Sequence, residues 1–296
     1  MLTISQLSKT YPNGVKALNN VNLEIPPGMF GLLGPNGAGK SSLMRTIATL
    51  QQPDSGSITL DGIDVLAQPD ELRKQLGYLP QDFGVYPRIS AEDMLDHLAS
   101  LKGFSDSAQR KEIVEALLAQ TNLLDVRKKA IAGFSGGMRQ RFGIAQALIG
   151  DPQLIIVDEP TAGLDPEERN RFLNLLSDIG ENKVVILSTH IVEDVTNLCP
   201  QMAVIARGEI VKQGKPVELI ADLAGSVWSK TVDRSDVESH RTRHNVISSH
   251  LYAGRCMLHV LAEQDPGDGF SLHEPDLEDV YFATLLAHGN TIDQAA

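Results

Sequence analysis

The segment GPNGAGKS, residues 34–41, constrains the fold of this chain more than any other stretch. It fits the pattern G-x-x-x-x-G-K-[ST] at every fixed position, and it follows an apolar run that ends at Leu33. An amphipathic run with Leu43, Met44, Ile47 and Leu50 on one face comes directly after it. A strand, a glycine-rich loop and a helix in this order are typical of an α/β protein whose loop holds phosphates. The sequence therefore predicts an α/β fold that binds a nucleoside triphosphate.

Each part of this loop has a chemical reason. The glycines let successive backbone N–H groups turn inward around the β- and γ-phosphates, the lysine adds a point charge, and the hydroxyl of Ser41 can bind Mg²⁺. We expect the loop and the start of the helix to bind the nucleotide through Gly34, Pro35, Asn36, Gly37, Ala38, Gly39, Lys40, Ser41 and Ser42.

A pair of carboxylates lies at the end of a second apolar run, in the segment LIIVDEP. Asp158 would hold the Mg²⁺ ion, and Glu159 could act as the general base that polarises an attacking water. An acidic strand end without function is the alternative for this segment alone. The phosphate loop makes the catalytic interpretation the better one.

Length and charge limit the remaining classes. A chain of 296 residues accommodates one large α/β domain with a smaller appendage. The formal net charge of -12 argues against nucleic acid as a partner, because binding phosphates needs concentrated Lys and Arg. Two cysteines without metal-ligand spacing favour a reduced compartment. The sequence shows no apolar run long enough to cross a bilayer.

Local signals predict the order of elements. Turns at Asp61-Gly62 and around Gly208 indicate two hairpins, and the stretch from about Tyr86 to Gly150 is expected to be a helical subdomain inserted into the α/β core. Ser90 and Asp93 fit a capping box within it. A later helix is predicted with Asp165 as its cap, Pro166 at its first position and Gly180 at its end.

The segment GFSGGMRQR, residues 133–141, predicts a second helix that begins with an anion-ready turn. Its Ser-Gly-Gly start leaves the first N–H groups of that helix uncovered, although the phosphate loop lies about a hundred residues earlier. The local residues leave open what the start of this second helix binds.

Taken together, these motifs resemble the ATP-binding subunit of an ABC transporter over residues 1–220. The resemblance implies a cassette with a RecA-like parallel-sheet core, an N-terminal antiparallel β subdomain and an inserted helical subdomain. Residues 221–296 would be a C-terminal extension that regulates the cassette, contacts a dimer partner or forms a loosely packed tail.

The resemblance also implies roles for residues outside the phosphate loop. Tyr11 would stack on adenine, Gln81 would join the metal site to the membrane-facing surface, and His190 would contact the γ-phosphate. Ser135, Gly136 and Gly137 would bind the γ-phosphate of a second subunit, and Asp165 would lie at the dimer seam. Each position has a plainer alternative: a surface aromatic, a polar loop residue, a structural histidine.

Partners follow from the same resemblance. Two cassettes, expected to be two copies of this chain, would pair head to tail around two ATP molecules and drive separate membrane permease subunits that dock near Gln81 and the following DFGVYPRIS. The chain would then lie on the inner face of the plasma membrane. The segments SGGMRQR and LEDVYFATL look most like the type 2 exporter branch. An importer cassette and a soluble ABC ATPase are the alternatives.

Two features are not explained by the resemblance to the ABC family: two substitutions in the segment FSGGM and the histidines of the extension. Phe134 replaces the usual leucine and Met138 the commoner glutamine, so a polar contact near the ribose is in doubt. The extension carries six of the eight histidines, at positions 240, 244, 250, 259, 273 and 288. We considered a metal site there, but their spacings match no standard ligand set.

Overall fold

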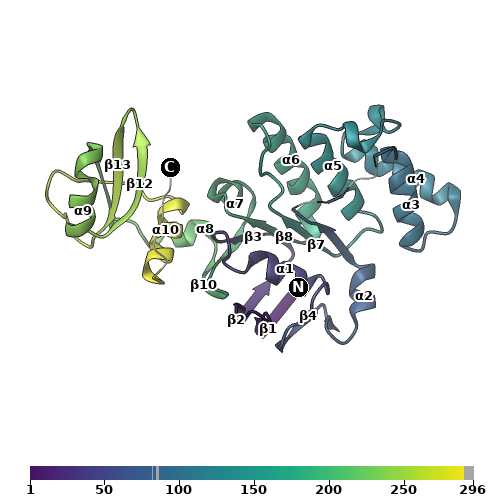
Figure 1. Ribbon diagram of the computed structural model, residues 1–296, viewed down its shortest axis with the longest axis horizontal. Helices are drawn as coiled ribbons and strands as arrows, with labels where there is room; N and C mark the ends of the chain where they lie inside the picture. The colour runs from purple at the N-terminus through teal and green to yellow at the C-terminus, as the bar shows by residue number, and fades with distance from the viewer. Residues whose placement is uncertain (82, 85–86, 290–296) are drawn as a thin grey trace.

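The computed structural model describes residues 1–81, 83–84 and 87–289, and it contains a cassette and a smaller C-terminal unit (Figure 1). A six-stranded sheet in the order β10-β9-β3-β8-β7-β6 forms the centre of the cassette. The pairs of β3 with β8 and β9, of β8 with β7, and of β7 with β6 are parallel, and β10 is antiparallel to β9. Its strands are β3 (Gly28–Leu33), β6 (Leu76–Leu79), β7 (Leu154–Asp158), β8 (Val184–Thr189), β9 (Gln201–Ala206) and β10 (Glu209–Gly214).

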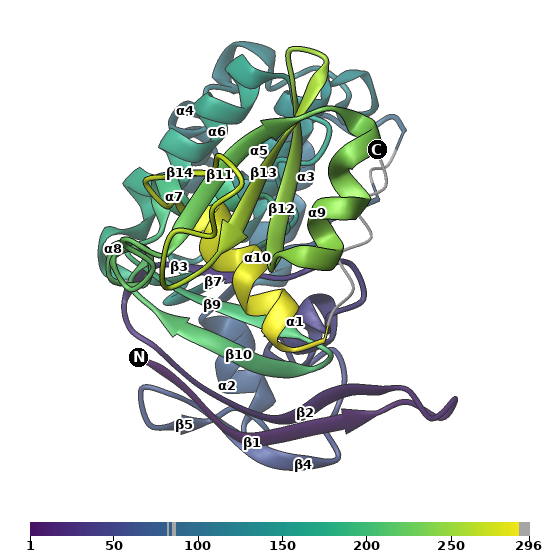
Figure 2. The same cartoon turned by 90° about the vertical axis from the view of Figure 1, so that its left-hand side faces the viewer.

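An antiparallel sheet in the order β2-β1-β4-β5 lies beneath the central sheet in Figure 2. Its strands are β1 (Leu2–Thr10), β2 (Lys16–Ile25), β4 (Ser55–Leu60) and β5 (Ile63–Asp64). The turn at Asp61-Gly62 joins β4 to β5, as predicted.

The central sheet is buried on both faces because successive side chains of a strand point to opposite sides. Leu32 and Ile156 belong to the apolar cluster shared with the antiparallel sheet and α1 (Lys40–Ile47). Their neighbours Leu33 and Val157 belong to the cluster formed with the helices on the other face. The near-continuous apolar runs of the sequence are therefore the strands of this sheet.

Helices of the cassette begin at the predicted caps. Ser90 accepts a hydrogen bond from the backbone N–H of Asp93 at 3.1 Å, and Asp165 caps a helix that starts at Pro166 and ends at the cap residue Gly180. The cassette helices besides α1 are α2 (Pro69–Lys74), α3 (Ala91–Leu101), α4 (Ser107–Gln120), α5 (Gly136–Ala147), α6 (Pro166–Ile179), α7 (Val192–Leu198) and α8 (Pro216–Ala221). Short 3₁₀ turns are η1 (Leu124–Val126), η2 (Ile131–Gly133) and η3 (Gly180–Asn182).

One detail of the pattern was wrong. Leu50 was expected on the buried face of α1, but the helix ends at Ile47 and Leu50 is exposed. The residue after the cap, Thr49, has a φ of +59°, so the chain leaves the helix before the apolar repeat is complete.

The C-terminal unit is a folded α/β layer. Its sheet has the order β12-β13-β11-β14, and Val232, Leu258, Val260 and Phe270 form its own apolar cluster. The elements are β11 (Val227–Val232), η4 (Arg234–Asp236), α9 (Val237–Arg243), β12 (Val246–Tyr252), β13 (Arg255–Leu261), β14 (Ser271–Leu272) and α10 (Leu277–Ala287).

Helix α10 connects this unit to the cassette. Leu277, Val280, Tyr281 and Leu285 belong to the same apolar cluster as the helical face of the central sheet, and α10 contacts both α7 and α8. The extension is thus packed onto the cassette. Tyr86, where the helical subdomain was predicted to start, and residues 290–296 of the predicted extension lie outside the described residues.

Candidate nucleotide-binding site

The phosphate loop leaves the central strand β3 and starts helix α1. Gly39 is the N-cap of α1 with a φ of +110°, and no side chain caps this helix. A Cβ on Gly39 would lie 2.5 Å from the carbonyl oxygen of Ala17, so only glycine fits there. The first N–H groups of α1 are therefore left for an external acceptor such as a phosphate.

Lys40 is buried at the base of this loop. Its Nζ donates to the carbonyl oxygen of Gly34 at 2.6 Å and lies 3.2 Å from Oε1 of Glu159. Sequence positions 119 apart are brought together here because β3 and β7 are both neighbours of β8 and end at the same edge of the sheet. These contacts fix the Lys40 ammonium group at the loop, where it can form a charged hydrogen bond with a bound phosphate.

Asp158 ends β7 and is buried. Burial raises the pKa of its carboxyl group, and the hydroxyls of Ser188 and Ser41 oppose that shift. Its Oδ1 is buried with no hydrogen-bond partner, which is costly for a carboxylate. A carboxylate with a free oxygen beside a serine hydroxyl is the oxygen donor set that suits Mg²⁺.

Glu159 has a backbone conformation that non-glycine residues rarely adopt. Its φ is +50°, a strain of roughly 1–3 kcal/mol, and the N–H of Glu159 donates to the carbonyl oxygen of Ser188 at 2.8 Å. The parallel neighbour β8 thus holds the residue in place. Strain of this kind concentrates at functional positions, and here it turns a carboxylate towards Lys40.

His190 follows β8 and contacts the same carboxylate. Its Nδ1 lies 2.5 Å from Oε2 of Glu159, while 47% of the His190 side chain is exposed and only 7% of the Glu159 side chain. A carboxylate only accepts hydrogen bonds, so a neutral His190 donates from Nδ1. Glu159 is therefore held between a cation and an imidazole, the arrangement of an oriented general base.

A cavity of about 450 Å³ unites these groups. Its lining comprises Tyr11, Val15, Lys16, Ala17, Pro35, Asn36, Gly37, Gly39, Lys40, Ser41, Ser42, Gln81, Glu159, His190 and Arg207. The Tyr11 hydroxyl is joined to Ser42 Oγ and Gln51 Oε1, each at 3.0 Å, so its ring is tied to α1. The lining residues at 15–17 and 207 were missed by the sequence reasoning, because nothing in their own segments marks them.

Seven predicted residues do not line this cavity: Gly34, Ala38 and Asp158 are sequence neighbours of lining residues, and Ser135, Gly136, Gly137 and Asp165 lie at the starts of α5 and α6. Ser135 caps α5 by accepting a hydrogen bond from the N–H of Met138 at 3.2 Å, and Asp165 caps α6 by accepting from the N–H of Glu168 at 2.9 Å. Ser135 and Gly136 are exposed, whereas Gly137 is buried. The prediction that the first N–H groups of α5 are uncovered was wrong for Met138, because its N–H donates to the Ser135 hydroxyl.

Gly137 has a steric role in addition. A Cβ there would lie 2.1 Å from Oε2 of Glu168 on α6, so glycine lets the starts of α5 and α6 approach each other. Gly136 has only a Leu164 atom at 3.6 Å. The two glycines of this turn are therefore unequal: a side chain at Gly137 would displace the Glu168 side chain, whereas Gly136 lies open to solvent.

Comparison with known proteins agrees with this geometry. The ABC transporter family model matches residues 18–162. The ABC transporter ATP-binding protein NatA of Bacillus subtilis is 37% identical over 220 residues, which are 72% of this chain and 89% of NatA. The chain belongs to the family of ABC transporter ATP-binding proteins.

Other relatives and solved structures place the ABC cassette within the chain. The Nod factor export ATP-binding protein I of Rhizobium etli is 38% identical over 228 residues, which are 76% of this chain and 71% of that protein. The dimeric structure of MJ0796, a bacterial ABC transporter cassette, has a TM-score of 0.67 at 27% identity and covers 73% of this chain and 98% of that one. The predicted fold, ATP-binding class and ABC family are thereby confirmed.

Membership defines the coarse function of this ABC protein: it is an ATP-binding subunit of a transporter, in a family of cassettes that hydrolyse ATP. Import and export both occur among its relatives, since the methionine import ATP-binding protein MetN of Bordetella pertussis is 34% identical over 290 residues. None of the helices in the described ranges is long and apolar enough to cross a membrane. The roles of single residues stay predictions.

Proposed function

We propose that this chain binds and hydrolyses ATP in a head-to-tail dimer with a second copy, and that closing and opening of the dimer drives export through separate permease subunits. The chain would then lie on the inner face of the plasma membrane. The single observation that carries hydrolysis is the Glu159 carboxylate, which lies within 3.2 Å of Lys40 Nζ and 2.5 Å of His190 Nδ1 at the open end of α1.

The charged and aromatic residues of this cavity have distinct roles in the proposed reaction. The N–H groups of α1 and the Lys40 ammonium bind the phosphates, and Tyr11 stacks on the base. Glu159 takes a proton from the attacking water, a role worth about 10²–10⁴ in rate. His190 orients Glu159 and meets the γ-phosphate, while the charge that builds up on that phosphate is stabilised by Lys40.

Mg²⁺ fits the oxygen groups next to the loop. Asp158, through its unpartnered Oδ1, Ser41 and Gln81 would hold the ion, which neutralises phosphate charge when bound. Gln81 lines the cavity and is exposed, so it can contact both the nucleotide site and a permease.

The second half of the site would come from the partner copy. Ser135 and Gly136 lie exposed at the start of α5 and are not among the residues that line the cavity of the same chain. A γ-phosphate bound on the partner's loop would find N–H groups and the positive end of the α5 dipole there, with Asp165 at the seam. The dimeric cassette structure of MJ0796 supports such a pairing.

Export is favoured over import by the names of the relatives. Nod factor export protein I and the daunorubicin/doxorubicin resistance protein DrrA are 38% and 33% identical to this chain. The MetN proteins keep import as the second candidate. Direction is tested by reconstituting the chain with its permease in vesicles and measuring on which side cargo accumulates.

A complementation experiment tests the shared site. Lys40→Ala and Ser135→Arg should each abolish hydrolysis, because each removes one half of both sites of a homodimer. Mixing the two variants should restore activity to about a quarter of wild type, since half of the dimers then hold one intact site. ATP turnover is measured before and after mixing the purified chains.

The control mixes Lys40→Ala with the double variant Lys40→Ala/Ser135→Arg, which leaves no functional loop and should stay inactive. If the first mixture stays as inactive as its components, while both variants keep native circular dichroism, Ser135 does not act across a dimer. Full turnover by Ser135→Arg alone would exclude it from the site altogether.

A further inference from the structure

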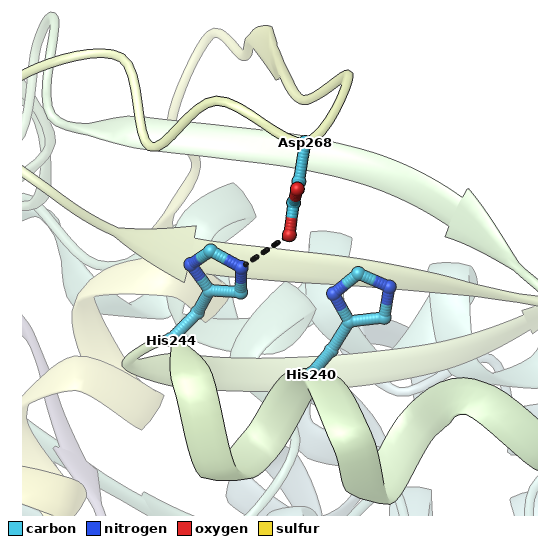
Figure 3. A group of neighbouring side chains, drawn as sticks. All are labelled: His240, His244 and Asp268. Atoms are coloured by element: carbon cyan, nitrogen blue, oxygen red, sulfur yellow. Dashed lines mark hydrogen bonds and ion pairs between the residues drawn. The ribbon is translucent and has the colours of Figure 1, made fainter.

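Two histidines and an aspartate of the C-terminal unit, none of which lines the ATP cavity, converge on one another (Figure 3). One nitrogen each of His240 and His244 and a carboxylate oxygen of Asp268 lie within 4.8 Å of one another. Neither the phosphate chemistry of the cassette nor its family motifs use these residues, so the cluster needs an explanation of its own.

Helix α9 creates the first half of the cluster. His240 and the C-cap residue His244 are four positions apart, so their rings lie on one face of the helix, with centroids 5.7 Å apart and planes inclined by 24°. Asp268 lies across from them in the loop between β13 and β14, where Phe270 packs edge-on against both rings. Residues 24 positions apart therefore face one point.

His240 carries a buried ring nitrogen that has no hydrogen-bond partner among the described residues. Only 5% of it is exposed, and its Nδ1 is buried without a hydrogen-bond partner. Figure 3 shows a ring nitrogen of His240 on the side that faces His244 and Asp268. A buried polar atom normally has a partner, so a group between these side chains would remove the cost of leaving it unpaired.

The distances suit a small cation. Nε2 of His244 lies 3.3 Å from Oδ2 of Asp268. Two ligand atoms of a tetrahedral zinc site, each about 2.0–2.1 Å from the ion, lie about 3.3 Å apart. One ligand pair is thus already at the required spacing, and a nitrogen of His240 lies within 4.8 Å of both its atoms.

We propose that His240, His244 and Asp268 bind one divalent transition-metal ion of the zinc type, with water as the fourth ligand. Two imidazole nitrogens and one carboxylate are a borderline donor set that zinc accepts and that Mg²⁺ and Ca²⁺, which prefer oxygen, do not. The ion joins α9 to the loop before β14 and so braces the C-terminal unit. This inference is independent of the ATP chemistry proposed above.

Two positively charged side chains, Arg243 and Lys230, lie near the cluster and affect the binding of a metal ion. Arg243 lies 2.8 Å from Oδ2 of Asp268, and Lys230 stands 5.5 Å from the centre of the Phe270 ring. The Arg243 side chain is half exposed and can turn to solvent when an ion takes its place. Burial, followed by the charges of Lys230 and Arg243, lowers the pKa of His240. A neutral imidazole is the form that binds a metal.

A second cluster, of His259, His273 and Asp279, provides a comparison. Both oxygens of Asp279 are engaged there: Oδ1 lies 2.6 Å from Nδ1 of His259, and Oδ2 accepts the N–H of Asp276 at 3.1 Å. That carboxylate completes the capping box of α10. The Asp279 carboxylate therefore has a structural role, whereas Asp268 pairs only with the side chains of Arg243 and His244 among the described residues. Nε2 of His259 is also buried without a partner, so the experiment has to separate the two clusters.

The test titrates tag-free, full-length protein, first stripped of metal by a chelator, with Zn²⁺ in a calorimeter and with Co²⁺ in a spectrophotometer. Nucleotide and Mg²⁺ are left out. One equivalent of each ion should bind, and Co²⁺ should show the visible bands of a tetrahedral nitrogen–oxygen site. His244→Gln and Asp268→Asn should each weaken Zn²⁺ binding at least about 10-fold and remove the Co²⁺ bands.

His288→Gln is the matched control, because His288 is an exposed histidine of the same unit that belongs to neither cluster; its Nδ1 lies 3.0 Å from the carbonyl oxygen of Thr284. It should bind Zn²⁺ as the wild type does. Unchanged affinity in His244→Gln and Asp268→Asn would overturn the proposal. Loss of binding in His273→Gln with retention in His244→Gln would also overturn it and assign the ion to the second cluster. Circular dichroism verifies that each variant is folded.

Discussion

Helices α1 and α5 both begin with glycine-rich turns, yet their starts differ in almost every other respect. At α1 the N-cap is a left-handed Gly39 without a side chain, followed by a buried Lys40 inside a cavity that also holds Glu159. At α5 the cap is Ser135, whose hydroxyl is occupied by the N–H of Met138, and the turn is exposed.

The difference fits the proposal that one chain carries two unequal halves of a shared site. The α1 start is surrounded by charge and depends on a ligand to satisfy its N–H groups. The α5 start is stabilised by its own serine, a cap worth about 1 kcal/mol, and it lies open to solvent. We therefore expect changes at α1 to affect nucleotide binding and chemistry, and changes at α5 to affect packing and pairing.

The largest effect is expected from Glu159→Gln on the α1 side. ATP turnover should fall about 10²–10⁴-fold, because the amide cannot take the proton of the attacking water. ATP binding should persist, and size-exclusion chromatography should show an ATP-bound dimer. Glu167→Gln, on the exposed face of α6, is the control and should turn over normally. Near-normal hydrolysis by Glu159→Gln would remove this residue from the role of base.

Lys40→Ala should weaken ATP binding by roughly 10–100-fold, since a charged hydrogen bond to phosphate contributes about 1.5–3 kcal/mol. Equilibrium binding of a fluorescent ATP analogue measures the change. Lys74→Ala, which removes an exposed lysine paired with Glu71, should bind as the wild type does. Equal affinities for all three proteins would contradict the assignment of the phosphate loop.

Tyr11 separates stacking from hydrogen bonding at the edge of the same cavity. Tyr11→Ala should cost about 1–3 kcal/mol of ATP affinity through the lost ring. Tyr11→Phe removes the hydroxyl that contacts Ser42 and Gln51 but keeps the ring, so its affinity should stay close to that of the wild type. If Tyr11→Phe were as weak as Tyr11→Ala, the hydroxyl would matter and stacking would not.

The smallest effect belongs to α5, where Gly137→Ala and Gly136→Ala form a matched pair. An added methyl at Gly137 displaces Glu168, which also lies 3.4 Å from Arg141, so we expect a loss of about 1–3 kcal/mol in unfolding free energy. Gly136→Ala meets only a Leu164 atom at the ordinary contact distance of 3.6 Å and should be nearly neutral. Urea denaturation of both variants decides the matter, and equal stabilities would contradict the close packing of α5 on α6.

Local signals explain how much of the fold could be predicted. The hairpin at Asp61-Gly62 and the helix from Asp165 to Gly180 follow from turn and cap chemistry, which involves only neighbours in the sequence. Leu50 marks the limit of this approach, because an apolar repeat cannot show where a helix stops.

Contacts between distant segments could not be predicted in the same way. Arg207 lines the ATP cavity from the end of β9, and no pattern in its own segment indicates this. His240 and His244 are four positions apart in the sequence, a spacing that places two side chains on one face of a helix. Asp268 comes close to them only through the fold of the extension.

By itself, the sequence determined the chemistry of this protein: the phosphate loop at 34–41, the carboxylates of Asp158 and Glu159, and the α/β order of its elements. Such features depend on residue type and short spacing, which a chain carries before it folds. Only the tertiary structure decided that Glu159 lies between Lys40 and His190. Parallel pairing of β7 and β3 with β8 places the ends of these strands at one edge of the sheet, and no local rule contains that pairing.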